Sequence, residues 1–287
     1  MGPDGLHRRQ LTRALFSSGS SVVINNQTLY IDGGEVRNLY SNQSILPEVP
    51  HEILTIDLSK SWENSDSDLF NSIPKPWNAS DPDNSPPILN EGATFSDGSN
   101  LFFYGGYISG ALTPKTVPPP LATWKYDIEG HSWTSNGFKG TPVERLSEGA
   151  TAQSVSTRKA FYLGGILDPG GDPRVYGTER ASPYSDSGLI VLDQDTLEWT
   201  NYSTAGINEF GTINDGYMNI IENVGDEGIL VAFGGNTRPV GGPISLLASL
   251  VHENEKVGPG PSLSYNIRTD KDPEFDAEYL RVRYSQR

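Results

Sequence analysis

The sequence predicts an all-β fold built from repeated units of antiparallel strands, and three observations lead to this prediction. The composition is rich in loop formers, with 31 Gly and 21 Pro among 287 residues, which favours short strands joined by turns over long helices. An apolar segment that ends in a Gly pair occurs four times. A segment in which Asp precedes Trp by five or six residues occurs three times.

The Gly pairs mark the end of one predicted strand in each repeat. The segments TLYIDGG, LFFYGG, AFYLGG and LVAFGG contain Gly33 and Gly34, Gly105 and Gly106, Gly164 and Gly165, and Gly234 and Gly235. Glycine adopts positive φ at no steric cost, so each pair predicts a buried strand that ends in a sharp change of direction. The strand before each of these opens near Gly19, Gly92, Gly149 and Gly216.

A second predicted hairpin follows three of the Gly pairs. Its segments, HEILTIDLSKSW, ATWKYDIEGHSW and LIVLDQDTLEW, contain Asp57 and Trp62, Asp127 and Trp133, and Asp193 and Trp199. Turn-forming residues lie between each Asp and its Trp, which predicts a tight turn capped by the aspartate. Each complete repeat is therefore predicted to be four antiparallel strands.

These residues resemble the kelch repeat, in which a Gly pair ends strand two, an Asp lies in the turn after strand three, and a Trp opens strand four. Arg145, ahead of Glu148 and Gly149, resembles the Arg that often precedes strand one. The resemblance implies an all-β, kelch-type β-propeller, here a partial one of about 3.5 blades, with the tryptophans packed between blades. The blades are predicted at residues 13–64, 90–135 and 147–201, with a partial blade at 215–236.

The two ends of the chain fall outside this pattern. Residues 1–12 are predicted to be an N-terminal extension. Residues 237–287, which contain no apolar strand that ends in a Gly pair and no Trp, are predicted to be a divergent and poorly ordered tail. Propellers close with about four to eight blades, so three explanations stay open. The chain is a piece of a longer propeller, closes as a four-bladed ring with its tail, or completes itself by pairing with another chain as a homo-oligomer.

The strand order places the long connections at one end of the blades and short turns at the other. Long loops on a rigid scaffold are typical of a binding face, and Tyr, Trp and Arg are the residue types that anchor interfaces. The candidates in these loops are Arg37, Tyr40, Trp77, Tyr107, Arg145, Arg174, Tyr176, Arg180 and Tyr184. We therefore expect a non-catalytic binding or scaffold module with a protein or glycan partner.

The sequence predicts no catalytic, metal-binding or cofactor-binding residues. It contains no Cys, which excludes the copper radical oxidases that share the kelch propeller, because their cofactor requires a Cys cross-linked to a Tyr. One alternative is a kelch-fold enzyme of the specifier or lyase kind that uses acidic loop residues near the central axis, where Asp168, Asp172 and Asp186 are available to hold calcium or iron. Another is a truncated product without independent function.

Charge and targeting signals bear on partners and location. The net charge of −15 disfavours nucleic-acid binding, because an acidic surface repels phosphates. No signal peptide and no segment long enough to span a membrane is recognisable. The long insertions resemble those of fungal kelch-repeat proteins that are secreted or membrane-anchored, which implies an extracellular or cell-surface location. Four sequons, at Asn26, Asn42, Asn78 and Asn201, permit N-glycosylation there.

Overall fold

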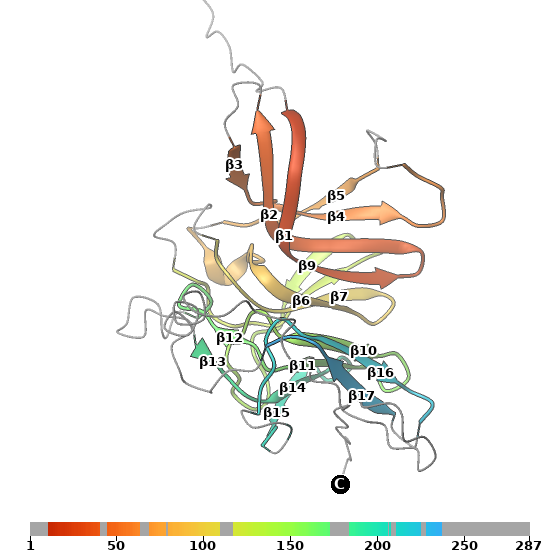
Figure 1. Cartoon of the computed structure of the whole chain (residues 1–287), viewed down its shortest axis with the longest axis vertical. Coiled ribbons are helices and arrows are strands. Elements are labelled where there is room, and N and C mark those ends of the chain that lie inside the picture. The colour runs from red at the N-terminus through yellow and green to blue at the C-terminus, as the bar shows by residue number, and fades with distance from the viewer. Residues whose placement is uncertain are drawn as a thin grey trace, which may run out of the picture.

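The computed structural model describes residues 11–40, 45–63, 69–78, 80–109, 117–172, 184–205, 207, 211–224 and 228–236 of the chain. For residues 11–18, 37–40, 45–48, 82, 184 and 185 it describes the backbone alone. The described residues form antiparallel β-sheets (Figure 1), and their only helical element is the 3₁₀ turn η1 (Pro82–Asn84). No helix in this part of the chain is long and apolar enough to cross a membrane.

The strands form three complete blades and one half-blade. Blade 1 contains β1 (Leu11–Asn25), β2 (Thr28–Tyr40), β4 (Glu52–Asp57) and β5 (Asn71–Pro74), with β3 (Ile45–Glu48) paired to β2. Blade 2 contains β6 (Asn90–Ser96), β7 (Asn100–Tyr107), β8 (Trp124–Asp127) and β9 (Ser132–Ser135). Blade 3 contains β10 (Ala150–Ser154), β11 (Lys159–Leu163), β14 (Leu189–Asp193) and β15 (Glu198–Tyr202). Half-blade 4 contains β16 (Tyr217–Ile221) and β17 (Ile229–Phe233).

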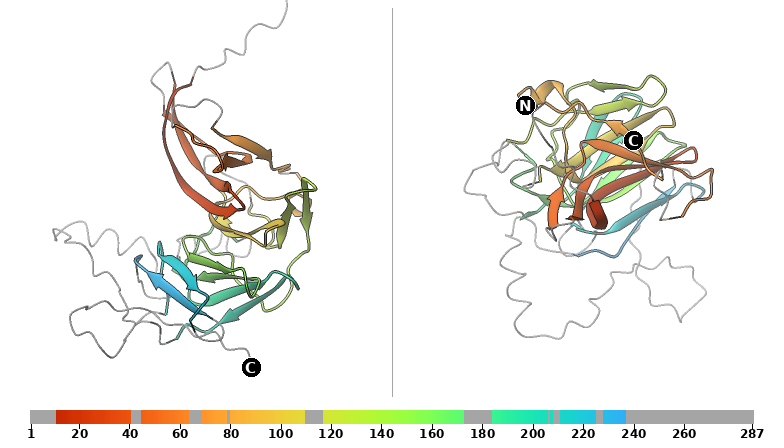
Figure 2. Two further views of the ribbon diagram at one scale, coloured as in Figure 1. Left: turned by 90° about the vertical axis from the view of Figure 1, so that its right-hand side faces the viewer. Right: turned by 90° about the horizontal axis from the view of Figure 1, so that it is seen from above.

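Each complete blade is an antiparallel meander in chain order, which confirms the predicted all-β fold of four-stranded propeller blades. The short strands β12 (Ile166–Leu167) and β13 (Tyr184–Ser185) pair separately. Figure 2 shows the sheets following one another along an arc, with β1 and β2 at one end and β16 and β17 at the other. The first strands of successive blades, β1, β6, β10 and β16, are neighbours and form one side of the arc.

Alternate residues of each strand bury themselves against opposite neighbours, as the two-residue period of a strand requires. In β11, Ala160 and Tyr162 belong to the apolar cluster between blades 2 and 3. Phe161 and Leu163, on the other face of the same strand, belong to the cluster between blade 3 and half-blade 4. The strands therefore read as continuous apolar runs, because both faces of an interior blade are buried.

The Gly pairs occupy the positions where one blade meets the next. All eight of these glycines have positive φ. A Cβ on Gly33, Gly105 or Gly164 would overlap the carbonyl oxygen of Leu89, Leu146 or Ile213, respectively. Each of these carbonyls lies just ahead of the first strand of the following blade. Glycine is required there for close approach of the next blade as well as for φ.

Blade 1 differs from the prediction in its fourth strand, which was expected to open at Trp62. The strand that pairs with β4 is β5, nine residues later. The segment after Trp62 is rich in Glu, Asn, Ser and Asp, which are poor strand formers, whereas Ile73 of β5 packs against the cluster between blades 1 and 2. Strand β1 also begins at Leu11, inside the predicted N-terminal extension. The predicted tail, 237–287, lies outside the described residues.

Candidate functional site

The connections at the two ends of the blades differ in length. At one end, here called the tight-turn end, the turns comprise residues 26–27, 97–99, 128–131, 155–158 and 194–197. At the other, the long-loop end, the connections comprise residues 75–89, 108–123, 136–149, 164–188 and 203–216. The exception is the connection 58–70, which is long yet belongs to the tight-turn end. The predicted difference in connection length between the two ends therefore holds for blades 2 and 3.

The repeated aspartates close tight turns, as predicted. The Oδ1 atoms of Asp57, Asp127 and Asp193 accept hydrogen bonds from the backbone amides of Ser59 (2.9 Å), Gly130 (2.6 Å) and Thr196 (3.0 Å). Because these carboxylates are committed to their own turns, the structure gives them a scaffold role.

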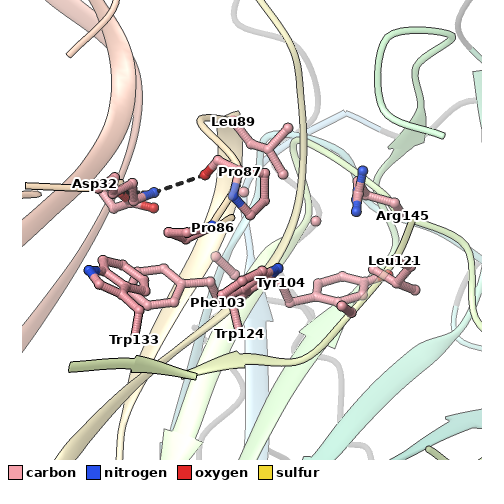
Figure 3. A pocket seen from close by; sticks show the side chains of 15 residues that line it. Asp32, Pro86, Pro87, Leu89, Phe103, Tyr104, Leu121, Trp124, Trp133 and Arg145 are labelled. Atoms are coloured by element: carbon pink, nitrogen blue, oxygen red, sulfur yellow. Dashed lines mark hydrogen bonds and ion pairs between the residues drawn. The ribbon is translucent and has the colours of Figure 1, made fainter. Parts of the chain in front are cut away.

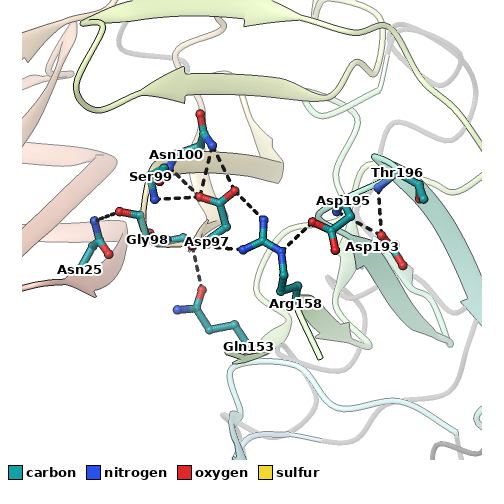
Figure 4. Close-up of polar contacts among 11 residues, drawn as sticks. Asn25, Asp97, Gly98, Ser99, Asn100, Gln153, Arg158, Asp193, Asp195 and Thr196 are labelled. Carbon is teal, nitrogen blue, oxygen red and sulfur yellow. Dashed lines mark hydrogen bonds and ion pairs between the residues drawn. The ribbon is translucent and has the colours of Figure 1, made fainter. Parts of the chain in front are cut away.

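Arg158 ties blades 2 and 3 together at the tight-turn end (Figure 4). Its guanidinium lies 3.2 Å from Asp97 Oδ2 in blade 2 and 2.6 Å from Asp195 Oδ1 in blade 3. Asp97 in turn accepts hydrogen bonds from the amides of Ser99 and Asn100 within its own turn. The polar groups of this end are thus used to hold neighbouring blades in register.

The predicted interaction residues are only partly covered by the structure. Trp77 and Tyr107 are half-buried at the long-loop end. For Arg37, Tyr40 and Tyr184 the backbone alone is described, within strands β2 and β13. Arg174, Tyr176 and Arg180 lie outside the described residues, as does the sequon residue Asn42. The other sequon residues, Asn26, Asn78 and Asn201, are exposed.

Arg145 corrects the prediction that it contacts a partner, because it is only 3% exposed. Its guanidinium donates hydrogen bonds to the carbonyls of Pro119 (2.8 Å), Pro120 (2.9 Å) and Gly171 (2.8 Å). These carbonyls belong to the connections that follow β7 and β12. A fork of several N–H donors suits this task, so Arg145 holds two long connections against the same point of the scaffold.

Three acidic residues form a row across the blades, which we call the acidic ladder: Glu91, Glu148 and Asp215. Each lies directly before the Gly that opens a first strand, and each has positive φ, at 57°, 60° and 55°. The amide of Glu148 donates to the carbonyl of Glu91 (3.1 Å), and the amide of Asp215 donates to the carbonyl of Glu148 (2.7 Å). Backbone bonds between blades therefore bring the three carboxyl groups together at the long-loop end.

The acidic ladder has an unusual electrostatic environment. Burial raises the pKa of Glu91, the charges of Asp215 and Asp168 raise it further, and a hydrogen bond from the Tyr107 hydroxyl (3.3 Å) opposes the shift. Burial also raises the pKa of Tyr107, as do the charges of Glu91 and Glu35. Non-Gly residues with positive φ are uncommon, and sites that combine strain with shifted pKa values are candidates for function.

The acidic ladder was not among the sites predicted from the sequence, although a repeated motif marks its positions. The motif Glu-Gly-Ala-Thr occurs at both Glu91 and Glu148, and Asp-Gly occurs at Asp215. The repeated glycines were predicted because the backbone requires them, and no role was predicted for the acidic residue before each. Aligning the three repeats position by position would have identified it.

Asp168, Asp172 and Asp186, which the sequence offered for metal binding, have separate local environments. Asp168 Oδ1 accepts a hydrogen bond from the Gly170 amide (2.6 Å), and burial raises its pKa. Asp186 Oδ1 accepts from the Ser187 amide (2.8 Å), and Asp172 is buried. Among the described residues, no three Asp, Glu or His side chains are placed to hold one metal ion.

A pocket lies between blades 1 and 2 (Figure 3). Lys75 Nζ lies 2.5 Å from Asp32 Oδ1, and both side chains are almost fully buried. The ammonium group also lies 5.1 Å from the centre of the Phe103 ring and 5.9 Å from that of Trp133. The indole of Trp133 donates to the carbonyl of Pro74 in blade 1 (3.2 Å). The pocket is thus lined by groups that join the two blades, among them the ion pair of Lys75 and Asp32.

Comparison with known proteins gives a distant structural likeness. No protein-family model matches the chain, and no curated protein matches it. Among solved structures, the chain is similar to YjhT, a β-propeller, at 13% sequence identity and a TM-score of 0.49. The match covers 76% of this chain and 59% of the YjhT chain. The chain therefore spans well under two thirds of the length of that structure.

Proposed function

We propose that the chain is a kelch-type propeller segment that acts as a non-catalytic binding module, with a protein or glycan partner at its long-loop end. The observation that carries this proposal is the division of labour between the two ends of the blades. At the tight-turn end the aspartates, and Arg158 with them, are engaged in turns and blade-to-blade bonds. The connections at the long-loop end are long, and long loops on a rigid scaffold are where binding residues gather.

The buried guanidinium of Arg145 supports this proposal. It fixes two long connections through three backbone carbonyls, so these connections keep one arrangement before a partner arrives. Loops that are ordered in advance lose less conformational entropy on binding, which favours affinity. Arg145 would therefore act through the loops that it positions, without touching the partner.

The chemistry of the long-loop end indicates what the partner presents. The carboxylates of the acidic ladder accept hydrogen bonds and attract positive charge. The ring of Tyr107, at the end of β7, lies beside Glu91, and Trp77 adds a second ring in the connection 75–89 at the same end. Hydroxyl-rich sugars and Lys-bearing peptides both match acceptors beside aromatic rings. An extracellular or cell-surface location, which the resemblance to fungal kelch-repeat proteins implies, fits such partners.

Binding to two arrays tests the proposal: one of neutral oligosaccharides and one of Lys-containing peptides. Arg145→Lys removes the fork that holds the loops, and Trp77→Ala removes a ring at the long-loop end. We expect each to weaken binding of a positive probe at least about fivefold, which corresponds to about 1 kcal/mol. Isothermal titration calorimetry with the selected probe measures the loss.

The matched control is Val155→Ser at the tight-turn end, where Val155 is 78% exposed. This variant should bind like the wild type. Failure of every probe to bind, or a loss caused by Val155→Ser that Trp77→Ala does not share, contradicts the proposal. Thermal unfolding of each variant separates a lost contact from a lost fold.

A second candidate function, a kelch-fold enzyme of the specifier or lyase kind, is favoured by one observation. The raised pKa of Glu91 is typical of a carboxyl group that exchanges protons during a reaction. If a small substrate is turned over, Glu91→Gln should abolish turnover while it leaves substrate binding measurable. Equal turnover in the wild type and in Glu91→Gln would remove this candidate.

A further inference from the structure

The outer face of blade 1 is apolar across three strands. Residues directly opposite one another on antiparallel strands share a face. Val22 pairs with Ile31 and Ile31 with Leu54, while Ile24 pairs with Leu29 and Leu29 with Ile56. The alternate residues Val23 and Tyr30 are buried against blade 2, so these six aliphatic residues face away from it. On this face Val22 and Ile24 in β1 are 59% and 61% exposed, whereas Ile56 in β4 is only 6% exposed.

Half-blade 4 has a matching apolar face at the other end of the arc. Met218, Leu230 and Ala232 are buried against blade 3. The alternate pairs, Tyr217 with Phe233, Asn219 with Val231 and Ile221 with Ile229, therefore lie on the face that points away from blade 3, which is apolar except for Asn219. The rings of Tyr217 and Phe233 stack with their centres 6.0 Å apart, and Tyr217 is 71% exposed. The arc ends in an apolar sheet face on both sides.

The backbone at Gly234 also has the form of a surface that receives a following blade. Its counterparts Gly33, Gly105 and Gly164 each lie against a carbonyl of the following blade. Gly234 has the same positive φ, 71°, yet no atom of the described residues lies within 4 Å of the position that a Cβ would take. Half-blade 4 thus carries the same glycine contact surface that the other blades use to receive a following blade.

We propose that these two faces bind each other between two copies of the chain, which join head to tail into a closed ring. The three interfaces within the chain all join the forward face of one blade to the backward face of the next. Within the described residues no blade follows half-blade 4 and none precedes blade 1, so a contact between copies continues the existing series. Ser20 pairs with Gly33 as Gly92 pairs with Gly105, and Ser17 precedes Ser20 by the same three residues that separate Leu89 from Gly92. The backbone at Ser17 would therefore approach Gly234 of the other copy.

Closure after two copies is compatible with known propellers. Each chain contributes three complete blades and one half-blade, so two chains contribute twice that, eight sheets, at the upper end of the range of about four to eight blades. Head-to-tail interfaces form a ring when the rotation closes and a filament when it does not. Here the two copies would form two identical interfaces, in which the two strands of half-blade 4 cover β1 and β2 of the other copy.

The test is the oligomeric state of the full chain, measured by light scattering after size-exclusion chromatography. We expect twice the mass of one chain. Two variants each block one face: Val22→Asp with Ile24→Asp, and Tyr217→Asp with Phe233→Asp. In a dimer of either variant, both interfaces would lack one of their two faces, so each variant alone should elute at the mass of one chain. An equimolar mixture should recover a dimer, because one interface between the two variants is native.

A comparison of two glycine-to-alanine variants is a second test, with a smaller expected effect. Gly98 also has positive φ, 96°, and no described atom within 4 Å of its Cβ position, but it lies in a tight turn. Gly234→Ala and Gly98→Ala therefore introduce similar local strain. We expect Gly234→Ala to weaken the dimer at least about tenfold, because the added Cβ meets backbone of the other copy, and Gly98→Ala to leave the dimer unchanged.

Three results would overturn the proposal. A wild-type chain that stays at the mass of one chain shows that something else, such as residues 237–287, covers the faces. Two blocked variants that fail to combine although circular dichroism shows both folded exclude a head-to-tail contact. A dimer that survives one face variant but not the other indicates a symmetric contact through a single face.

Discussion

Trp199 and Trp62 hold the same position in the repeat and have opposite environments. Trp199 is 2% exposed, its indole donates to Thr123 Oγ1 (2.8 Å), and its ring lies 4.9 Å from Tyr104 of blade 2. Trp62 is 48% exposed. Trp199 lies in β15 and packs against the preceding blade, whereas Trp62 lies in the connection 58–70, outside the fourth strand, and the described residues contain no blade before blade 1. A motif residue is therefore buried only where its strand forms and a neighbouring blade receives it.

Trp133 shows the intermediate case. It packs on Phe103 and Tyr126 of its own blade, with ring centres 5.2 and 5.0 Å apart, and reaches blade 1 through its hydrogen bond to Pro74. The prediction that these tryptophans lie between blades is thus confirmed for Trp199 and Trp133 and wrong for Trp62.

The largest expected effect separates Trp199 from Trp62. Trp199→Ala should lower the free energy of unfolding by about 3–5 kcal/mol, as large-to-small changes in a core do. Trp62→Ala should change it by about 0.5 kcal/mol or less, as at other surface positions. Urea denaturation followed by far-UV circular dichroism measures both. Equal losses would show that Trp62 is buried by something outside the described residues.

Measuring the stability of the Trp62→Ala and Trp199→Ala variants at several protein concentrations tests whether a second copy covers Trp62. If a second copy covers the outer face of blade 1, the cost of Trp62→Ala should grow with concentration, because dimer formation is linked to stability. The cost of Trp199→Ala, which acts inside one chain, should not. A concentration-independent cost at both positions would place Trp62 outside any contact between copies.

The next largest effect concerns the joint between blades 1 and 2. Lys75→Met leaves Asp32 buried without its cation, which should cost about 3 kcal/mol. Replacing both partners, with Asp32→Leu added, should recover most of this loss, because the uncompensated charge is gone. Urea denaturation of the two single variants and the double variant gives the coupling. Additive losses would mean that the ion pair 2.5 Å long contributes no coupling.

The smallest expected effect is a pH dependence. The folded pKa of Glu91 is raised above its ordinary value of 4.5, so its ionisation opposes folding. The penalty is absent below the unfolded pKa and complete once the pH exceeds the folded pKa. Glu91→Gln should therefore stabilise the protein at about pH 7 and change little at about pH 4, as thermal unfolding at the two pH values measures.

Asp97 is the control of opposite sign. Burial works to raise its pKa, but hydrogen bonds from Asn100 and Ser99, and the charge of Arg158, together lower it. Its contribution to stability is present above its unfolded pKa and is lost as the pH falls through the folded pKa. Asp97→Asn should therefore destabilise more at about pH 7 than at about pH 3. The same sign for both variants would contradict the assigned environments.

The features that the sequence predicted correctly depend on local chemistry. The Gly pairs end strands because their backbone needs positive φ, and the aspartates cap turns within a few residues of themselves. These requirements are written in neighbouring residues, so the meander of each blade could be derived from the chain alone. The alternation of long loops and tight turns follows from the same strand order.

The predictions that were wrong concern contacts between distant residues. Arg145 and a surface Arg look alike in sequence, and only the approach of Pro119 and Gly171 makes Arg145 a buried anchor. The acidic ladder likewise forms because one blade hydrogen-bonds to the next at Glu91, Glu148 and Asp215. Resemblance to a repeat could place these residues on a blade, but not beside one another.

The two-faced packing of the strands limits how the chain can change in evolution. Inserting one residue into β11 would exchange the side chains that face blade 2 with those that face half-blade 4, and both clusters would lose their fit. Insertions into the connections cost little loop entropy, and they spare both clusters where they avoid the buried loop residues Val143, Leu146 and Ile213. Gains and losses of residues should therefore be confined to the connections, chiefly at the long-loop end, and new specificities can arise there while strand lengths remain fixed.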